Sequence, residues 1–385
     1  MITFSSRAQQ GNYDGQALGW IKVYKYPTPV KPIKVDHRTY TIGQQSTCNL
    51  FANWIQASYV PTGGLGDVRK MASDKLGPYN QVTKSLPQSY GAYSKTYVSL
   101  RKSSSGKLAP ADNTAHNWRI IANQTIGHQV ELLSTSDQYY FYIQHYKEGA
   151  KDDYKELEEA SKLGGFDKHP VLNKYIHFYQ PKNGFLGTGL QYVVVLCKNN
   201  ILPFTPVTIG EFIEKTEKRI PEWYVEELAK NKESNSYDTR RIEQEKKWIE
   251  EKLERAKINL SKLKEKYKNN WDEAAYVIPG NINIQDLTSS IQSTDWDFFE
   301  DRGLERFPVY KHDPVIASRC KTDQPQWIVI SWDAEGVLNE EPAGIHLHES
   351  ILNNFNFDYV YNYFFQPEKI KGINYNPLRS PGKEE

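Results

Sequence analysis

The most constraining feature of this sequence is a charge-dense stretch with a seven-residue apolar repeat between residues 208 and 270. From Glu211 to Lys268, 30 of 58 positions are charged, 14 acidic and 16 basic, whereas the 385-residue chain as a whole is 25% charged. Opposite charges alternate along the stretch, which is typical of a solvated helix and argues against a nucleic-acid-binding stripe. The stretch therefore predicts a helical insertion distinct from its surroundings.

The apolar residues of this stretch indicate two helices that pack on each other as a coiled coil, with the repeat broken at Lys246. The repeat consists of Ile242, Ile249, Ala256 and Leu263, interleaved with Leu253, Leu260 and Tyr267. Thr208-Ile-Gly-Glu211 fits a capping box at the start of the first helix. Pro221 is expected to interrupt that helix and restart it, and 232–236 to form the turn. We expect an antiparallel helical hairpin over about 208–270.

The rest of the chain is predicted to be a β-rich mixed body, which makes the fold class α+β. Apolar residues three and four apart predict a helix from Cys48 to Ser58, and the mixed pattern of 348–365 favours helix. Short charged helices are expected at 152–163 and 295–301, and a linker at 102–110. Runs of β-branched and aromatic residues predict strands at 18–24, 93–100, 118–121, 130–133, 139–143, 192–197 and 326–332. The predicted segments are 1–108, 113–207, 208–275 (the hairpin) and 276–385, the last packing on the β-rich body.

Charge and cysteine content exclude several classes of protein. Lys plus Arg is 48 and Asp plus Glu is 47, so the net charge of +1 excludes a chain dominated by polyanion binding. No apolar run approaches the roughly 20 residues of a transmembrane helix. Cys48, Cys197 and Cys320 are isolated in sequence, which indicates buried thiols rather than a disulfide framework. No nucleophile motif such as G-x-S-x-G is present.

Aromatic residues make up 13% of the chain, with 26 Tyr, 15 Phe and 9 Trp. Tyr can be half buried while its hydroxyl stays in water, so this excess favours a surface that binds sugars or peptides. Residues 1–10 lack the charged and apolar regions of a signal peptide. The polar run 5–15 resembles the start of a mature exported chain, so we expect the cell envelope or exterior, with a cytoplasmic start as the alternative.

A candidate metal site lies at His346, His348 and Glu349. On a strand both imidazoles would face one side, and with the carboxylate they could hold a divalent transition metal. On a helix the two rings would diverge by about 200° and could not chelate together. The other interpretation is that these histidines hydrogen-bond to the body, and no cofactor is predicted.

Two further candidate sites are weaker. Rings beside carboxylates could stack on sugars and accept hydrogen bonds from their hydroxyls, but the pattern favours a helix start and a strand end. Gly63, Gly64 and Gly66 could cradle an anion if their loop feeds a helix N-terminus, or could be a plain turn. The candidate ligand-binding residues are Asp295, Trp296, Asp297, Trp332 and Asp333.

The segment that runs from His346-Leu-His-Glu-Ser-Ile-Leu-Asn-Asn-Phe through Asn-Phe-Asp-Tyr-Val360 resembles part of an uncharacterised family of exported bacterial proteins. Residues 198–212 are similar to the same family. The resemblance covers about a tenth of the chain and implies export and a shared architectural unit. It implies no activity and no catalytic residue.

Three functions are compatible with these patterns. The first is a non-enzymatic binding protein of the cell envelope or exterior, with a protein or glycan partner. The second is a metal- or carboxylate-dependent hydrolase centred on His346, His348 and Glu349. The third is a structural protein that assembles through the hairpin, although one hairpin can satisfy its own apolar seam, so the oligomeric state stays open.

Overall fold

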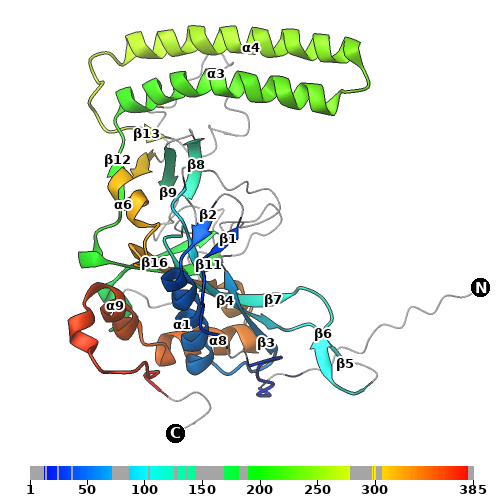
Figure 1. Cartoon of the computed structure of the whole chain (residues 1–385), viewed down its shortest axis with the longest axis vertical. Helices are drawn as coiled ribbons and strands as arrows, with labels where there is room; N and C mark the ends of the chain where they lie inside the picture. Colours follow the sequence, from blue (N-terminus) through cyan, green and yellow to red (C-terminus); the bar gives the residue numbers. More distant parts are fainter. Residues whose placement is uncertain are drawn as a thin grey trace, which may run out of the picture.

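A computed structural model of the chain shows helices together with antiparallel sheets, which confirms the α+β class. In Figure 1 the helical hairpin lies at the top, a four-stranded sheet lies below it, and a six-stranded sheet with its helices forms the bottom of the molecule. The residues that the structure describes are 13, 15–23, 26–35, 38–71, 86–102, 105–124, 129–134, 138–143, 169–181, 190–277, 297, 299–300 and 306–379.

The six-stranded sheet is antiparallel throughout, with strand order β10-β11-β16-β7-β4-β3. Strand β16, the last of these strands in sequence, lies in the middle between β11 and β7. These elements confirm the strands predicted around 93–100, 118–121, 192–197 and 326–332. Their bounds are β3 (Leu65–Met71), β4 (Tyr90–Tyr97), β7 (Ala115–Ala122), β10 (Ile176–Pro181), β11 (Leu190–Cys197) and β16 (Trp327–Asp333).

Helices α1 (Ile42–Ser58), α8 (Pro342–Asn354) and α9 (Phe357–Phe365) cover one face of this sheet. Because successive strand residues point to opposite faces, the even-numbered residues of β7 and β16, such as Trp118 and Ile330, enter this core. The ambiguous stretch 348–365 is helical, as favoured, but breaks at Phe355. That ring is fully buried, 5.3 Å from the ring of Trp118.

The opposite face of the sheet has two halves. One half is apolar, where Val193, Val195 and Trp327 pack against a smaller core. The other half, on β3, β4 and β7, is mostly polar, with a small apolar cluster of Leu65, Tyr97 and Ala115 at one end. The free cysteines Cys48, Cys197 and Cys320 are all buried, and burial raises the pKa of each thiol to about 12, which confirms the interpretation of buried thiols.

A four-stranded antiparallel sheet, of order β12-β15-β9-β8, connects the hairpin to the large sheet. Its strands are β8 (Gln129–Ser134), β9 (Tyr139–Ile143), β12 (Phe204–Pro206) and β15 (Tyr310–His312), which confirms the strands predicted at 130–133 and 139–143. Three chain segments meet beside it through backbone hydrogen bonds. Val207 N donates to Val309 O at 3.0 Å, Ala275 N to Val207 O at 2.8 Å, and Val309 N to Ala275 O at 2.9 Å.

The hairpin consists of α3 (Ile209–Ser234) and α4 (Thr239–Lys266), packed antiparallel as predicted (Figure 1). Four residues of the predicted seam are buried in it, namely Ile249, Ala256, Leu260 and Leu263. Pro221 lies inside a continuous α3, so the predicted interruption is wrong. Proline removes one backbone hydrogen bond, but the buried side chains of Ile220 and Trp223 hold the turns on either side against their neighbours.

The start of α3 shows half of the predicted capping box. The Thr208 hydroxyl accepts from Glu211 N at 3.2 Å. The Glu211 carboxylate instead accepts from Lys311 Nζ at 2.6 and 2.7 Å and from Tyr140 Oη at 3.0 Å. Because Lys311 and Tyr140 lie on β15 and β9, this carboxylate ties the first turn of the hairpin to the four-stranded sheet.

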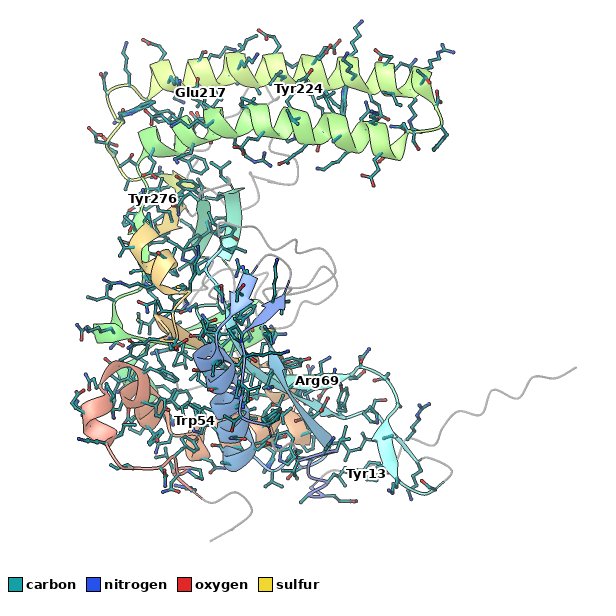
Figure 2. The ribbon with its side chains drawn as sticks, viewed as in Figure 1. Tyr13, Trp54, Arg69, Glu217, Tyr224 and Tyr276 are labelled. Atoms are coloured by element: carbon teal, nitrogen blue, oxygen red, sulfur yellow. The ribbon has the colours of Figure 1, made fainter. Side chains whose placement is uncertain are left out.

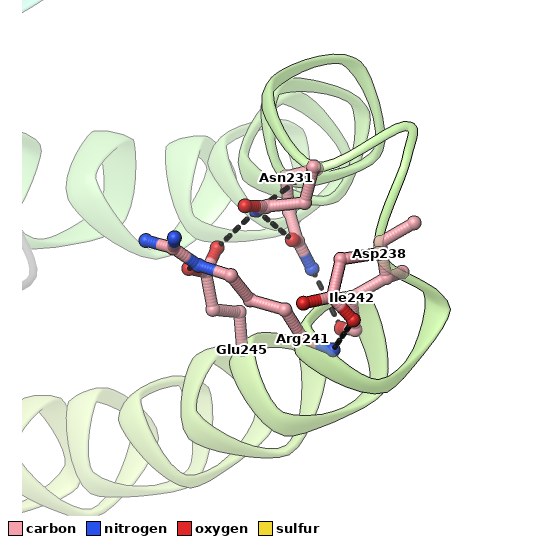
Figure 3. Close-up of polar contacts among 6 residues, drawn as sticks. Asn231, Asp238, Arg241, Ile242 and Glu245 are labelled. Carbon is pink, nitrogen blue, oxygen red and sulfur yellow. Dashed lines mark hydrogen bonds and ion pairs between the residues drawn. The ribbon is translucent and has the colours of Figure 1, made fainter.

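At the far end of the hairpin, buried amides join the two helices (Figure 3). Asn231 Nδ2 donates to Ile242 O at 2.9 Å, across the turn from α3 to α4. Asn235 Nδ2 donates to Asn231 Oδ1 at 2.9 Å and to Glu245 Oε2 at 2.8 Å. Asp238 caps α4 by accepting from Arg241 N at 3.1 Å. These directional bonds fix how the two helices align.

Other parts of the described chain differ from expectation. Of the strand predicted at 18–24, the described residues 18–23 form no strand and contribute only an isolated bridge at Trp20, next to Gly19 with its φ of 72°. The predicted linker is a two-stranded arm, β5 (Leu100–Lys102) with β6 (Leu108–Pro110). The remaining elements are β1 (Ile33–Val35), β2 (Arg38–Tyr40), β13 (Tyr276–Val277), β14 (Phe307–Pro308), α6 (Pro314–Arg319), α7 (Glu335–Leu338) and the 3-10 helices η2 (Leu172–Lys174), η3 (Lys198–Asn200) and η5 (Pro367–Ile370).

Two predicted helices cannot be compared with the structure, since 152–163 lies outside the described residues and so does most of 295–301. Strands from three of the predicted segments, 1–108, 113–207 and 276–385, share the six-stranded sheet, and the segment boundaries stay predictions. No helix within the described ranges has the length and apolarity that crossing a membrane requires.

His312 on β15 is an unusual core residue. Its ring is 1% exposed and stacks on Trp327 at 5.6 Å, with Phe141 at 5.0 Å and Phe204 at 5.2 Å. Neither ring nitrogen has a hydrogen-bond partner among the described residues. Burial lowers the pKa of this imidazole to about 3, so His312 is neutral at pH 7.

We expect His312→Phe to stabilise the protein by about 1 kcal/mol at pH 7, because a buried polar group without a partner destabilises the folded state by roughly that amount or more. Urea unfolding followed by tryptophan fluorescence measures the change. His177→Phe, at a half-buried histidine whose Nδ1 lies 2.9 Å from Tyr175 O, is the control and should give no gain. A loss of stability in His312→Phe would contradict the assignment of an unsatisfied ring.

Candidate functional site

A pocket of about 380 Å³ lies at the base of the hairpin, where α3 begins and α4 ends. Its volume falls in the range of small-molecule sites, about 300–1,000 Å³. Figure 2 shows Tyr276 below this end of the hairpin. The lining residues are Ile209, Tyr267, Asn270, Glu273, Ala274, Tyr276, Phe299 and Arg306.

The connector after α4 forms one wall of the pocket because it pairs with the first turn of α3. Ile209 N donates to Glu273 O at 2.9 Å, and Gly210 N donates to Trp271 O at 2.9 Å. A side chain at position 210 would place its Cβ 2.3 Å from Trp271 Nε1. Glycine at 210 is therefore what allows the indole to lie against α3 and the connector to close the wall.

Asp297, a predicted ligand-binding residue, supports the pocket from behind. Its carboxylate accepts from Tyr267 Oη at 2.9 and 3.0 Å, from Lys266 Nζ at 2.6 Å and from Phe299 N at 2.9 Å. These bonds hold the Phe299 segment against the end of α4. Burial, followed by the contact with Asp297, raises the pKa of Tyr267, so its hydroxyl stays protonated and donates. Asp295 and Trp296 lie outside the described residues.

The pocket combines aromatic surfaces with polar groups of both signs. The Arg306 guanidinium lies 5.9 Å from the centre of the Tyr276 ring and donates to Phe299 O at 3.4 Å. Glu273 Oε1 accepts from Asn270 Nδ2 at 2.6 Å. Tyr276 is 43% exposed, so its ring is open to a ligand. Such a lining can stack on an apolar face and hydrogen-bond to its rim.

The structure does not bring His346, His348 and Glu349 together, which corrects the predicted metal site. All three lie on α8, where residues two apart diverge around the helix. His346 Nε2 lies 3.0 Å from Val60 O, His348 Nδ1 accepts from Trp332 Nε1 at 3.0 Å, and Glu349 is exposed. Across the described part of the chain, no group of three or more His, Cys, Asp or Glu residues could hold a metal ion.

Trp332 and Asp333 lie on opposite faces of the large sheet, so they do not form the predicted pair of ring and carboxylate. The Trp332 ring is 1% exposed and stacks on Tyr192 at 5.3 Å. Asp333 Oδ2 accepts from Asn117 N at 2.8 Å and Asn117 Nδ2 at 2.7 Å on the other face. Neighbouring residues of one strand necessarily separate in this way.

The predicted anion loop is also corrected, because no helix follows it. Gly66 belongs to β3, and Gly63 adopts a φ of 70° just before that strand. A Cβ at Gly64 would lie 2.7 Å from Tyr97 O. These glycines permit close strand packing, and the loop does not present the helix N-terminus that would attract an anion.

Sequence reasoning did not single out the pocket. Tyr267 was assigned to the hairpin seam, and Arg306, Glu273 and Asn270 carry no local motif. The lining comes from chain positions as distant as Ile209 and Arg306. The sequence feature that could have indicated the pocket is the pair of aromatic residues Trp271 and Tyr276 in the otherwise polar connector after α4.

Comparison of the chain with protein-family models, with curated proteins and with solved structures gives no match, so the function must be argued from the geometry of this chain.

Two buried neutral histidines predict that the protein loses stability in mild acid. Burial lowers the pKa of His348 to about 4, with His169 contributing, and that of His312 to about 3. Both values lie below the usual 6.5, so the unfolded chain binds more protons as the pH falls. The contribution of these two histidines to the unfolding free energy is therefore fully present above about pH 6.5. Below that pH it decreases, by up to about 1.4 kcal/mol per pH unit for each histidine.

The substitution His348→Asn tests this, because an asparagine oxygen can still accept from Trp332 Nε1 but does not titrate. We expect the unfolding free energy of this variant to depend less steeply on pH between pH 6 and 4.5, by up to about 1.4 kcal/mol per pH unit, which corresponds to one proton. Urea unfolding at several pH values measures the slope, with His177→Asn as the control. An unchanged slope in His348→Asn would show that His348 is not held neutral.

Proposed function

We propose that this chain is a non-enzymatic binding protein of the cell envelope or exterior, and that the pocket at the hairpin base holds a sugar unit of a glycan. The observation that carries the proposal is the lining itself, with the open ring of Tyr276 beside Arg306, Glu273 and Asn270. The exterior location is supported by the Tyr-rich composition and by the resemblance to exported proteins.

A sugar fits this lining because it has two kinds of surface. Its C–H face can stack on an aromatic ring, and Tyr276 offers such a ring at the mouth of the pocket. Its hydroxyls both donate and accept, which suits a guanidinium, a carboxylate and an amide lying around one cavity. A purely apolar ligand would leave these polar groups without partners, at a cost in affinity.

Binding is favoured over glycoside cleavage because of the carboxylates. Hydrolysis of a glycoside generally uses two carboxyl groups that flank the bond. Glu273 is the one carboxylate among the described lining residues, and Asp297 is engaged by Tyr267, Lys266 and Phe299 behind the wall. The alternative, a hydrolase centred on His346 and His348, is less favoured because these two side chains do not point to a common site.

Assembly through the hairpin is less favoured because α3 and α4 fill each other's apolar seam. The exposed Trp248 ring on the hairpin is partly satisfied within the chain, since Lys252 Nζ lies 3.3 Å from its centre. This contact is a favourable cation–π interaction. A second copy of the chain is therefore not needed to complete the hairpin.

The test is saturation-transfer NMR with a panel of glucose, galactose, N-acetylglucosamine and their β-linked disaccharides, followed by titration of the sugars that respond. We expect Tyr276→Ala to weaken binding about tenfold, since losing an aromatic stacking surface removes about 0.5–1.5 kcal/mol beyond the buried area. Tyr237→Ala, at the 83% exposed tyrosine of the hairpin turn, is the matched control and should bind as the unmodified protein does.

Two results would contradict the proposal. One is the absence of saturation transfer from every sugar at millimolar concentration. The other is equal affinity of Tyr276→Ala and the unmodified protein, which would place binding elsewhere. Circular dichroism of each variant shows that the comparison is made between folded proteins.

A further inference from the structure

The polar half of the six-stranded sheet brings cations from three adjacent strands onto one face. On β3, β4 and β7 the odd-numbered residues point away from the helices, because the even-numbered ones enter the core beneath α1 and α8. We define the polar face as Asp67, Arg69, Tyr93, Lys95, Asn117 and Arg119. Figure 2 labels Arg69 on this part of the sheet.

Strand register places Arg119 at the centre of this face. It lies directly opposite Tyr93 of β4 on one side and opposite Ser331 of β16 on the other. Tyr93 in turn lies opposite Arg69. Directly opposed side chains on one face of a sheet have Cβ atoms about 4.5–5.5 Å apart, so the side chains of Tyr93 and Ser331 flank that of Arg119.

Arg119 has no partner among the described residues. It is partly buried, yet its side chain makes no hydrogen bond, ion pair or ring contact within the part of the chain that the structure describes. Arg38 provides the contrast, since this buried arginine donates to Pro87 O at 2.8 Å and Leu86 O at 2.6 Å. Burying an unpaired charge is costly, so the buried Arg38 is paired, whereas the partly buried Arg119 keeps its guanidinium available to a ligand.

Two carboxylates on strands of this sheet, Asp67 of β3 and Asp333 of β16, are engaged by other groups. Asp67 accepts from Arg69 Nε at 2.6 Å, and Asp333 accepts from the backbone and side chain of Asn117. Lys95 lies opposite Asn117 and Asp67, two residues along β4 from Tyr93, and its Nζ lies 5.9 Å from the centre of the Tyr97 ring. The face therefore holds an unpaired guanidinium flanked by Tyr93 and Ser331, with a further positive charge along β4.

We propose that the polar face binds the phosphate group of a small ligand, with Arg119 as its main donor. A planar guanidinium offers two parallel N–H groups that match two oxygens of a phosphate, which makes such pairs both strong and directional. Lys95 contributes charge, and the hydroxyls of Tyr93 and Ser331 supply further donors. This site is separate from the pocket at the hairpin base and does not depend on the sugar-binding proposal.

The first experiment titrates inorganic phosphate into the full chain at low ionic strength, followed by two-dimensional NMR or calorimetry. We expect saturable binding that Arg119→Gln weakens at least tenfold and that Arg119→Lys also weakens, because an ammonium cannot make the two parallel bonds. Arg101→Gln, at an exposed arginine of β5, is the matched control and should bind phosphate normally. Tyr276→Ala should also bind it normally.

A second arm compares glucose 6-phosphate with inorganic phosphate and with glucose. Tighter binding of the ester than of the free ion, lost in Arg119→Gln, supports a phosphorylated small molecule. Equal affinity for the two supports the free ion as the ligand. The proposal is overturned if phosphate does not saturate the protein up to 20 mM (about a hundred times a typical protein concentration for NMR), if Arg119→Gln binds it unchanged, or if Arg101→Gln weakens binding equally.

Discussion

The pairing of β11 with β16 in the centre of the large sheet is the interaction on which the rest of the molecule depends. All seven residues of β16 are buried, and the strand joins β11 to β7. Between Cys197 and Trp327 the chain leaves this sheet, builds β12, the hairpin and β15, and returns to the neighbouring ladder. Because antiparallel neighbours must align residue by residue, this return fixes where the excursion begins and ends.

The parts of the fold that local patterns determine were predictable from sequence. The run Tyr192–Cys197 and the run Trp327–Trp332 are rich in β-branched and aromatic residues, which predicts strands. The seam of α4 was visible because Ile249, Ala256 and Leu263 recur every seven residues. The interruption predicted at Pro221 was wrong because the sequence shows only the local loss of a backbone hydrogen bond. The burial of Ile220 and Trp223 on either side, which stabilises the helix, depends on tertiary packing.

The sites were largely invisible in sequence for a physical reason. His346 and His348 looked like a metal pair only if their segment were extended, and whether it is a strand or a helix is decided by packing on the sheet. Asp297 was predicted as a ligand-binding residue, and its bonds to Lys266 and Tyr267 place it beside the end of α4, where it supports the pocket wall. In the sequence Arg119 is one polar residue within a predicted strand. Its position beside Tyr93 and Ser331 follows only from the register of the strands in the sheet.

The meeting of three backbone segments at Val207, Ala275 and Val309 has a consequence for how this chain can change. Thr208 and Ala274 form a bridge there, so the helical arm departs and rejoins through adjacent backbone positions about 5 Å apart. The base of the arm shares a buried core with the four-stranded sheet, since Phe212 and Leu260 lie in one cluster with Tyr140. An arm of another length can therefore replace the outer part of the hairpin, whereas the first turns of α3, the last turns of α4 and the bridge between them must be kept.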